Sequence, residues 1–84
     1  MTRMAKLNAR LLNGGKLTFA EFQRLLEAYG FTLMRVSGSH HIYVRQGIRD
    51  QLSIQPAGAE AKPYQLRQFL RILQDNGLTL DGHE

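Results

Sequence analysis

The sequence predicts an α+β fold in which helices cover one face of a three-stranded antiparallel sheet. Apolar residues recur at helical spacing in three segments, at residues 4–13, 18–29 and 63–76. Between the last two segments, two stretches with strand character flank Gly38-Ser39, and residues 51–55 alternate polar and apolar side chains. Helices and strands gathered into separate runs are typical of an α+β domain.

The chain has 84 residues, which suits one domain with a single hydrophobic core. We assign residues 1–84 to that domain, with a short helical extension at 4–13, a core at 18–78 and a loose tail at 81–84. Cysteine is absent, which excludes disulfides, thiolate metal sites and a cysteine nucleophile and suits a reducing cytoplasm. No apolar run approaches the length of a membrane span. We therefore expect a soluble, cytoplasmic protein.

The charge distribution favours a polyanionic partner. The net charge is +4 and the pI is about 10.0, as in many proteins that bind phosphate groups. Arg35, Arg45 and Arg49 cluster around Gly38-Ser39, whereas Asp and Glu residues collect near the C-terminus. The end of the molecule that contains Gly38 and Ser39 is therefore expected to be the positive end.

The second and third helices have clear start and stop signals. Thr18 and Glu21 form a capping-box pattern, in which a hydroxyl and a carboxylate satisfy free backbone amides reciprocally. Gly30 suits the left-handed residue that ends this helix, and Pro63 suits the first position of the next. The apolar stripes of the two helices consist of Phe19, Phe22, Leu25, Leu26 and Tyr29, and of Leu66, Phe69, Leu70 and Leu73.

Gly38-Ser39 predicts a tight β-hairpin, because a leading glycine suits the positive φ of a type II′ turn. A two-residue turn pairs Ser37 with His40, and the remaining pairs follow. They are Val36 with His41, Arg35 with Ile42, Met34 with Tyr43 and Leu33 with Val44. One face then carries Phe31, Leu33, Arg35, His40, Ile42 and Val44, and the other Thr32, Met34, Val36, His41, Tyr43 and Arg45. We expect the first face to be the core side.

The strand at residues 51–55 follows a polar loop at 46–50. Its alternation points Leu52 and Ile54 inward. Residues 56–61 contain Pro and Gly, which a strand accommodates poorly, so we expect a loop that crosses the sheet before the last helix.

His40 is the residue with the clearest candidate chemistry. An imidazole can exchange a proton near neutral pH without a metal or cofactor. A base that takes the ribose 2′-hydroxyl proton lets that oxygen attack the adjacent phosphate, and nearby cations stabilise the developing charge. Arg35, Arg45 and Lys62 are candidates for these cations. The alternative is that His40 is simply a strand residue beside a turn.

Four other residues each have a functional and a structural interpretation. His41 points away from His40 on a strand, which argues against one metal bound by both. Ser39 lacks an obvious carboxylate and base arrangement for a nucleophile. Lys62 precedes a helix N-terminus, where it forms an anion site or is simply solvated. Tyr43 stacks on a base or packs in the core.

Several motifs occur together around the hairpin and the last helix. They are Gly30-Phe31, Arg35, the run Gly38-Ser39-His40-His41-Ile42-Tyr43, Lys62-Pro63, Leu66-Arg67, Ile72-Leu73 and Gly77-Leu78. This combination resembles the HicA (YcfA-like) toxin family over about residues 19–78. The resemblance implies a double-stranded-RNA-binding-like fold and a cofactor-free mRNA endoribonuclease (mRNA interferase) of a type II toxin–antitoxin system, neutralised by a HicB-like antitoxin.

The resemblance also implies roles for residues of the hairpin. The catalytic histidine of the family falls on His40, and in some members it lies one position later, so His41 is the alternative. The expected RNA or phosphate contacts are Arg35, Gly38, Ser39, Tyr43, Arg45 and Lys62. Two alternative hypotheses assign the protein to a class other than enzymes: a noncatalytic RNA-binding module and a protein-interaction adaptor.

Two features depart from the family pattern. Many members have a Pro-x-His motif after the third strand, whereas this chain reads Gln55-Pro56-Ala57 and has no histidine there. The segment before Thr18 is an addition to the shortest members. It could serve antitoxin binding, dimerisation or a larger core.

Overall fold

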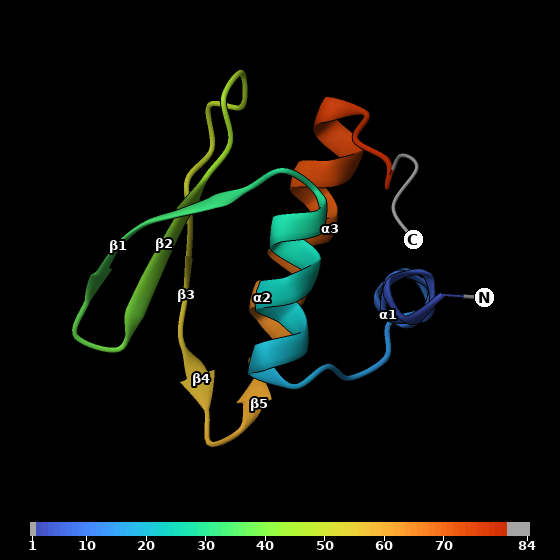
Figure 1. Cartoon of the computed structure of the whole chain (residues 1–84), viewed down its shortest axis with the longest axis horizontal. Helices are drawn as coiled ribbons and strands as arrows, with labels where there is room; N and C mark the ends of the chain where they lie inside the picture. The colour runs from blue at the N-terminus through green and yellow to red at the C-terminus, as the bar shows by residue number, and fades with distance from the viewer. Residues whose placement is uncertain (1, 81–84) are drawn as a thin grey trace.

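The computed structural model describes residues 2–80 and confirms the α+β fold (Figure 1). The predicted loose tail at 81–84 lies outside the described residues. The elements are α1 (Arg3–Leu12), α2 (Phe19–Ala28), β1 (Thr32–Ser37), β2 (His40–Val44), β3 (Leu52–Ile54), β4 (Pro56–Ala57), β5 (Glu60–Ala61) and α3 (Pro63–Asn76). Strands β1, β2 and β3 form one antiparallel sheet in that order, and β4 and β5 form a separate small hairpin.

The helices lie on one side of the sheet (Figure 1). Helices α2 and α3 form the layer next to the sheet, and α1, seen end-on, lies beyond them on the side away from the strands. Strand β1 is the sheet edge farthest from the helices. The helices therefore cover the sheet unevenly.

The predicted helix boundaries are confirmed by the capping geometry. The Thr18 hydroxyl accepts a hydrogen bond from the Glu21 amide, and the Glu21 carboxylate accepts one from the Thr18 amide. Gly30, with φ of 86°, follows the end of α2, and Gly77, with φ of 61°, caps α3. These are backbone conformations that glycine adopts at little cost, which is why both helices end there.

An aromatic cluster centred on Phe69 joins α3 to α2 and to the start of the sheet. The ring of Phe69 lies 5.8 Å from Phe22, 5.4 Å from Tyr29 and 5.7 Å from Phe31, between ring centroids. Aromatic pairs in such tilted and edge-on arrangements add to the free energy gained from burial.

The predicted inward face of β3 is confirmed. Leu52 is fully buried, as the alternation of its strand predicted.

The predicted hairpin register is correct next to the turn and wrong farther away. Ser37 pairs with His40, as predicted. Gly38 has a φ of 62°, and the φ of Ser39 is not positive, as a type II′ turn requires. A β-bulge at Met34 then shifts the register, so that Leu33 pairs with Tyr43. The predicted pairs of Met34 with Tyr43 and of Leu33 with Val44 are therefore wrong, because β1 contains one extra residue.

The predicted core face of the hairpin is correct for Phe31 and Leu33, which lie on the buried side, but it is wrong for β2 and for the part of β1 next to the turn. Tyr43, which we expected on the outer face, is only 1% exposed and pairs with the buried Leu52. The face that carries His40 and Arg35 points away from the helices instead. The physical reason is that β2 pairs with β3 in the register that aligns its Tyr43 side with the apolar side of β3.

Residues 56–61, expected to be a loop, form the β4–β5 hairpin. Gly58, with φ of 64°, allows the tight turn between the two short strands. The carbonyl of Ala59 accepts a hydrogen bond from the Phe19 amide, and the Ala61 amide donates to the carbonyl of Leu17. The hairpin is thus fixed to the start of α2.

The capping box makes a stability prediction with a definite sign. The hydrogen bond from the Thr18 amide, aided by the charge of Arg10 and opposed by partial burial, lowers the pKa of Glu21 below its ordinary value of 4.5. A carboxyl group whose pKa is lower in the folded than in the unfolded state stabilises the protein at pH values above its unfolded-state pKa. This stabilisation is lost as the pH falls through the folded-state pKa. Glu21→Gln should therefore lower the free energy of unfolding at pH about 6 and lower it less at pH about 3.

Denaturant titrations at the two pH values measure this difference. Glu27→Gln is the matched control, because Glu27 is exposed on the same helix and only its backbone carbonyl, which the substitution keeps, takes part in a helix cap. Equal pH dependence of the two variants would contradict the assignment.

Candidate functional site

His40 lies on the open face of the sheet. It is exposed, it is the first residue of β2, and its ring Nδ1 is 3.2 Å from the hydroxyl oxygen of Ser53 on β3. Either atom can donate in this hydrogen bond, depending on the histidine tautomer. The other ring nitrogen, Nε2, makes no hydrogen bond with the residues that the structure describes, and it belongs to an exposed side chain. The contact with Ser53 thus orients the imidazole while Nε2 stays accessible.

Ser53 is itself held in place by Gln65 of α3. Gln65 is 2% exposed, and it is the one buried polar residue among those the structure describes. Its Oε1 accepts a hydrogen bond of 3.1 Å from the Gln55 amide, and its Nε2 donates to the Ser53 carbonyl at 3.4 Å. One side chain therefore attaches the backbone of β3 on both sides of Ile54 to the helix. Neither Ser53 nor Gln65 was singled out from the sequence.

Arg35 lies on the same face as His40. In the sheet, Arg35 pairs with Ile42, and Ile42 pairs with Ser53, so these three side chains form one row across the strands. His40 is two residues before Ile42 and so is a diagonal neighbour of Arg35, about 7–8 Å away between backbones. Arg35 is exposed. A cation, an imidazole and a hydroxyl thus share one open patch, which we call the outer patch (Arg35, His40 and Ser53).

His41 occupies the opposite face, against α2. Its ring centroid lies 5.1 Å from that of Phe19 in an edge-on arrangement. Its Nδ1 lies 3.1 Å from the Ser39 carbonyl oxygen, and because a carbonyl only accepts, Nδ1 donates. His41 therefore links the hairpin turn to the first turn of α2. The two adjacent histidines occupy opposite faces of the sheet, as the strand pattern predicted.

Tyr43 is the candidate that the structure removes from the solvent. Its ring is buried, and its hydroxyl oxygen accepts a hydrogen bond of 3.1 Å from Nε2 of Gln23. Burial raises the pKa of Tyr43 above its ordinary value of 10.0. The structure therefore favours the packing interpretation of Tyr43, because no face of the ring is free to stack on a base.

Arg45 and Lys62 lie at different distances from His40. Arg45 is beside Gly30, where a Cβ would come within 3.5 Å of its Nε, and five residues along an extended chain separate it from His40 by about 16 Å. Lys62 is the half-buried N-cap of α3. It follows β5, whose partner β4 begins two residues after β3, at the end of the sheet where His40 begins β2.

Gly38 and Ser39 form the turn itself. Gly38 has positive φ and open space around it, so a larger residue would be strained by backbone conformation and not by a clash. Ser39 is exposed and supplies the carbonyl that His41 binds. Both residues therefore lie next to His40 in the turn.

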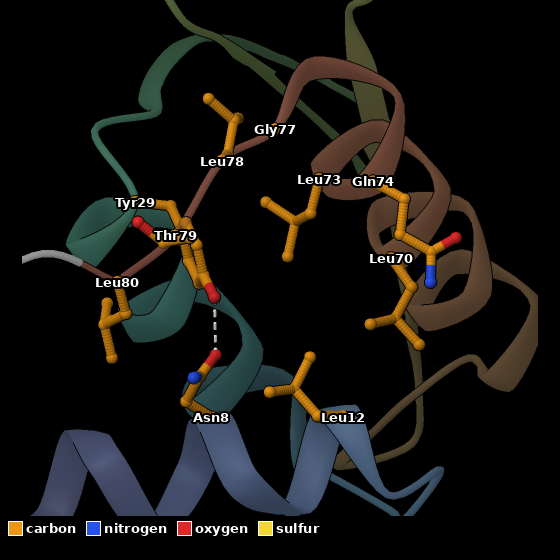
Figure 2. Close-up of a pocket in the computed structure, with 10 residues that line it drawn as sticks. All are labelled: Asn8, Leu12, Tyr29, Leu70, Leu73, Gln74, Gly77, Leu78, Thr79 and Leu80. Carbon is orange, nitrogen blue, oxygen red and sulfur yellow. Dashed lines mark hydrogen bonds between the residues drawn. The ribbon is translucent and has the colours of Figure 1, made fainter.

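A groove on the other side of the molecule contains none of the candidate residues. Figure 2 shows this apolar groove of about 330 Å³, between α1, α3 and the segment that follows α3. Leu12, Leu70 and Leu73 point into it, and the Tyr29 hydroxyl donates to Asn8 at one side over 2.6 Å. The outer patch, in contrast, is an open surface.

Within residues 2–80, no three His, Cys, Asp or Glu side chains converge as metal ligands would. In the same part of the chain, none of the helices is both long and apolar enough to span a membrane.

The fold and the site define a small basic α+β domain with an exposed histidine on the open face of its sheet. Residues 19–80 match the family model described as HicA toxin of bacterial toxin-antitoxin. The chain therefore belongs to the HicA toxins, and it is the toxin component of a toxin–antitoxin system. Searches of curated proteins and of solved structures gave no match.

The different surroundings of the two histidines predict different effects on stability. His41→Ala removes the contact with Phe19 and should lower the free energy of unfolding by about 1 kcal/mol. His40→Ala should change it by less than about 0.5 kcal/mol, because His40 is exposed. Urea titrations of both variants and wild type measure these differences. A larger loss in His40→Ala than in His41→Ala would refute this division of roles.

Proposed function

We propose that this toxin is an mRNA endoribonuclease in which His40 is the general base. The observation that carries the proposal is the pairing of an exposed His40 with Ser53, which leaves Nε2 free on the open face of the sheet. Membership of the HicA toxins supports a nuclease-type activity. An open patch also suits a substrate as large as a nucleic acid, which a small closed cavity would not admit.

The proposed reaction begins at the ribose 2′-hydroxyl. Nδ1 of His40 carries its proton and donates to the Ser53 hydroxyl, so that Nε2 holds the free electron pair. Nε2 takes the 2′-hydroxyl proton as the 2′-oxygen attacks the adjacent phosphorus. The bond from phosphorus to the 5′-oxygen breaks, and that oxygen takes a proton from water and leaves as a 5′-hydroxyl. The other product end is a 2′,3′-cyclic phosphate.

Arg35 is the cation best placed for the phosphate in this proposal. It lies diagonally across from His40 on the same face, and its guanidinium can contact two phosphate oxygens at once. Lys62, farther along the same end of the sheet, would contact a neighbouring phosphate. The net charge of +4 adds a general attraction for RNA.

The partner in the proposed system is a HicB-like antitoxin. The HicA family implies an antitoxin partner for this toxin. Because the outer patch is open, that partner can neutralise the enzyme by covering it.

The first test compares wild type with His40→Ala on a purified RNA. Wild type should cleave with EDTA present and produce 2′,3′-cyclic phosphate ends, and a substrate with 2′-O-methyl groups should resist. His40→Ala should cleave about 10²- to 10⁴-fold more slowly, as is typical when a general base is removed. His41→Ala is the matched control, and it should retain most of its activity at temperatures where it is folded. Unchanged cleavage by His40→Ala would refute the role of His40, and RNA binding without cleavage by wild type would favour a noncatalytic module.

A second test concerns Ser53. Ser53→Ala removes the hydroxyl that orients His40 and should slow cleavage by up to about tenfold, whereas Ser53→Thr, which keeps a hydroxyl, should not. The ¹⁵N chemical shifts of the His40 ring report its tautomer independently of activity. They should move toward a mixture of tautomers in Ser53→Ala alone. Identical shifts in Ser53→Ala and wild type would show that Ser53 does not position the ring.

A further inference from the structure

We propose that β1 is the edge at which the antitoxin docks, by adding a strand of its own to the sheet. The toxin's need for an antitoxin follows from its family, and only the consequence for RNA cleavage rests on the function proposed above.

Strand β1 is exposed along its whole length. All six of its residues, Thr32 to Ser37, are exposed, whereas β2 and β3 each contain buried residues. Five large hydrophobic side chains are strongly exposed within residues 2–80, and three of them belong to β1. These are Leu33 at 45%, Met34 at 43% and Val36 at 53%. Exposed apolar residues concentrated on one strand are typical of an interaction surface.

The backbone of β1 is available as well. In the sheet order β1-β2-β3, the first strand pairs with β2 alone, so its other side has no strand partner among the described residues. Figure 1 shows the part of β1 next to the turn at the outer edge of the sheet, away from α2 and α3, whereas the strand starts close to the end of α2. Proteins usually protect such an edge with charges or bulges. Here Arg35 and the bulge at Met34 provide some protection, but three apolar side chains remain in solvent.

A second copy of this chain fits the edge less well than the antitoxin does. Antiparallel pairing of two β1 strands about a twofold axis would bring the two Arg35 side chains close together, and like charges in neighbouring cross-strand positions are destabilising. Each copy also has a net charge of +4. The surface therefore favours a partner of complementary charge, and a protein partner for this toxin is implied by its family.

The two faces of β1 define the chemistry of the added strand. Leu33 pairs with Tyr43 and Val36 with His41, so both apolar side chains lie on the helix side of the sheet. Arg35 lies on the other side, in the outer patch. The antitoxin strand should therefore alternate, with apolar residues on the helix side and an acidic residue opposite Arg35.

This position explains how docking would block the enzyme. An acidic side chain of the added strand would pair with Arg35, the cation proposed to hold phosphate, which is a diagonal neighbour of His40 across β1 and β2. Docking at the edge can therefore neutralise the toxin without an inhibitor entering a cleft.

The test separates docking from activity with the double variant Leu33→Asn/Val36→Asn. Both residues are exposed, so the fold should be kept, and the net charge that attracts RNA is unchanged. Expressed alone, the variant should inhibit growth as wild type does. Co-expressed with the cognate antitoxin, it should remain toxic, and its Kd for the purified antitoxin should rise at least about tenfold.

Leu12→Asn is the matched control, because Leu12 is 58% exposed but points into the groove between α1 and α3 (Figure 2). It should still be neutralised. Normal neutralisation of the β1 variant would overturn the proposal, as would escape of Leu12→Asn, which would move the docking site to the groove. The proposal would also be overturned, in favour of self-association, if the wild-type toxin without antitoxin sedimented as a dimer and the β1 double variant sedimented as a monomer.

Hydrogen exchange on the wild-type toxin gives a readout that needs no variant. Amides of residues 32–37 should exchange more slowly with antitoxin bound, and unchanged exchange there would overturn the proposal even if the double variant failed to fold. If wild type inhibits growth but does not cleave RNA, the proposed enzyme activity fails while the docking result remains valid.

Discussion

The pairing of β2 with β3 is the constraint on which the rest of this structure depends. It aligns Tyr43 of β2 with Leu52 of β3, so that both large side chains are buried under α2 and α3. Because successive side chains of a strand point to opposite faces, this alignment sends His40 to the open face. A one-residue slip would reverse every side chain of β2 and place His41 outside instead. The identity of the accessible histidine is thus decided by the burial of a tyrosine.

The sequence predicts the helices well because their signals are local. A capping box, a proline at a helix start and a glycine at a helix end each depend on a few neighbouring residues, and Thr18, Pro63 and Gly30 are found in those roles. The turn at Gly38 is local in the same sense. In contrast, the buried face of the hairpin depends on strands and helices far apart in the chain. Both faces of β1 and β2 carry apolar residues, so periodicity alone does not decide between them.

The same limitation explains why parts of the candidate site were missed. Ser53 is an ordinary outward residue of an alternating strand, and only the pairing of β3 with β2 brings it to His40. Gln65 carried a signal that could have been used, because it is a polar residue four positions before Phe69 on the apolar stripe of α3. A polar side chain in such a position is costly to bury unless it is hydrogen-bonded. Its bonds to β3 meet that requirement.

The position of the outer patch has a consequence for control of the toxin. An active site in a cleft can be regulated by a lid, but the proposed site lies on an open sheet face, and the helices that could cover it are occupied on the other face. Control must therefore come from a second molecule. Such a molecule needs a firm attachment close to His40, and the sheet offers one where β1 leaves apolar side chains and backbone unpaired. The poor coverage of β1, which costs the free toxin some stability, is then what would make it controllable.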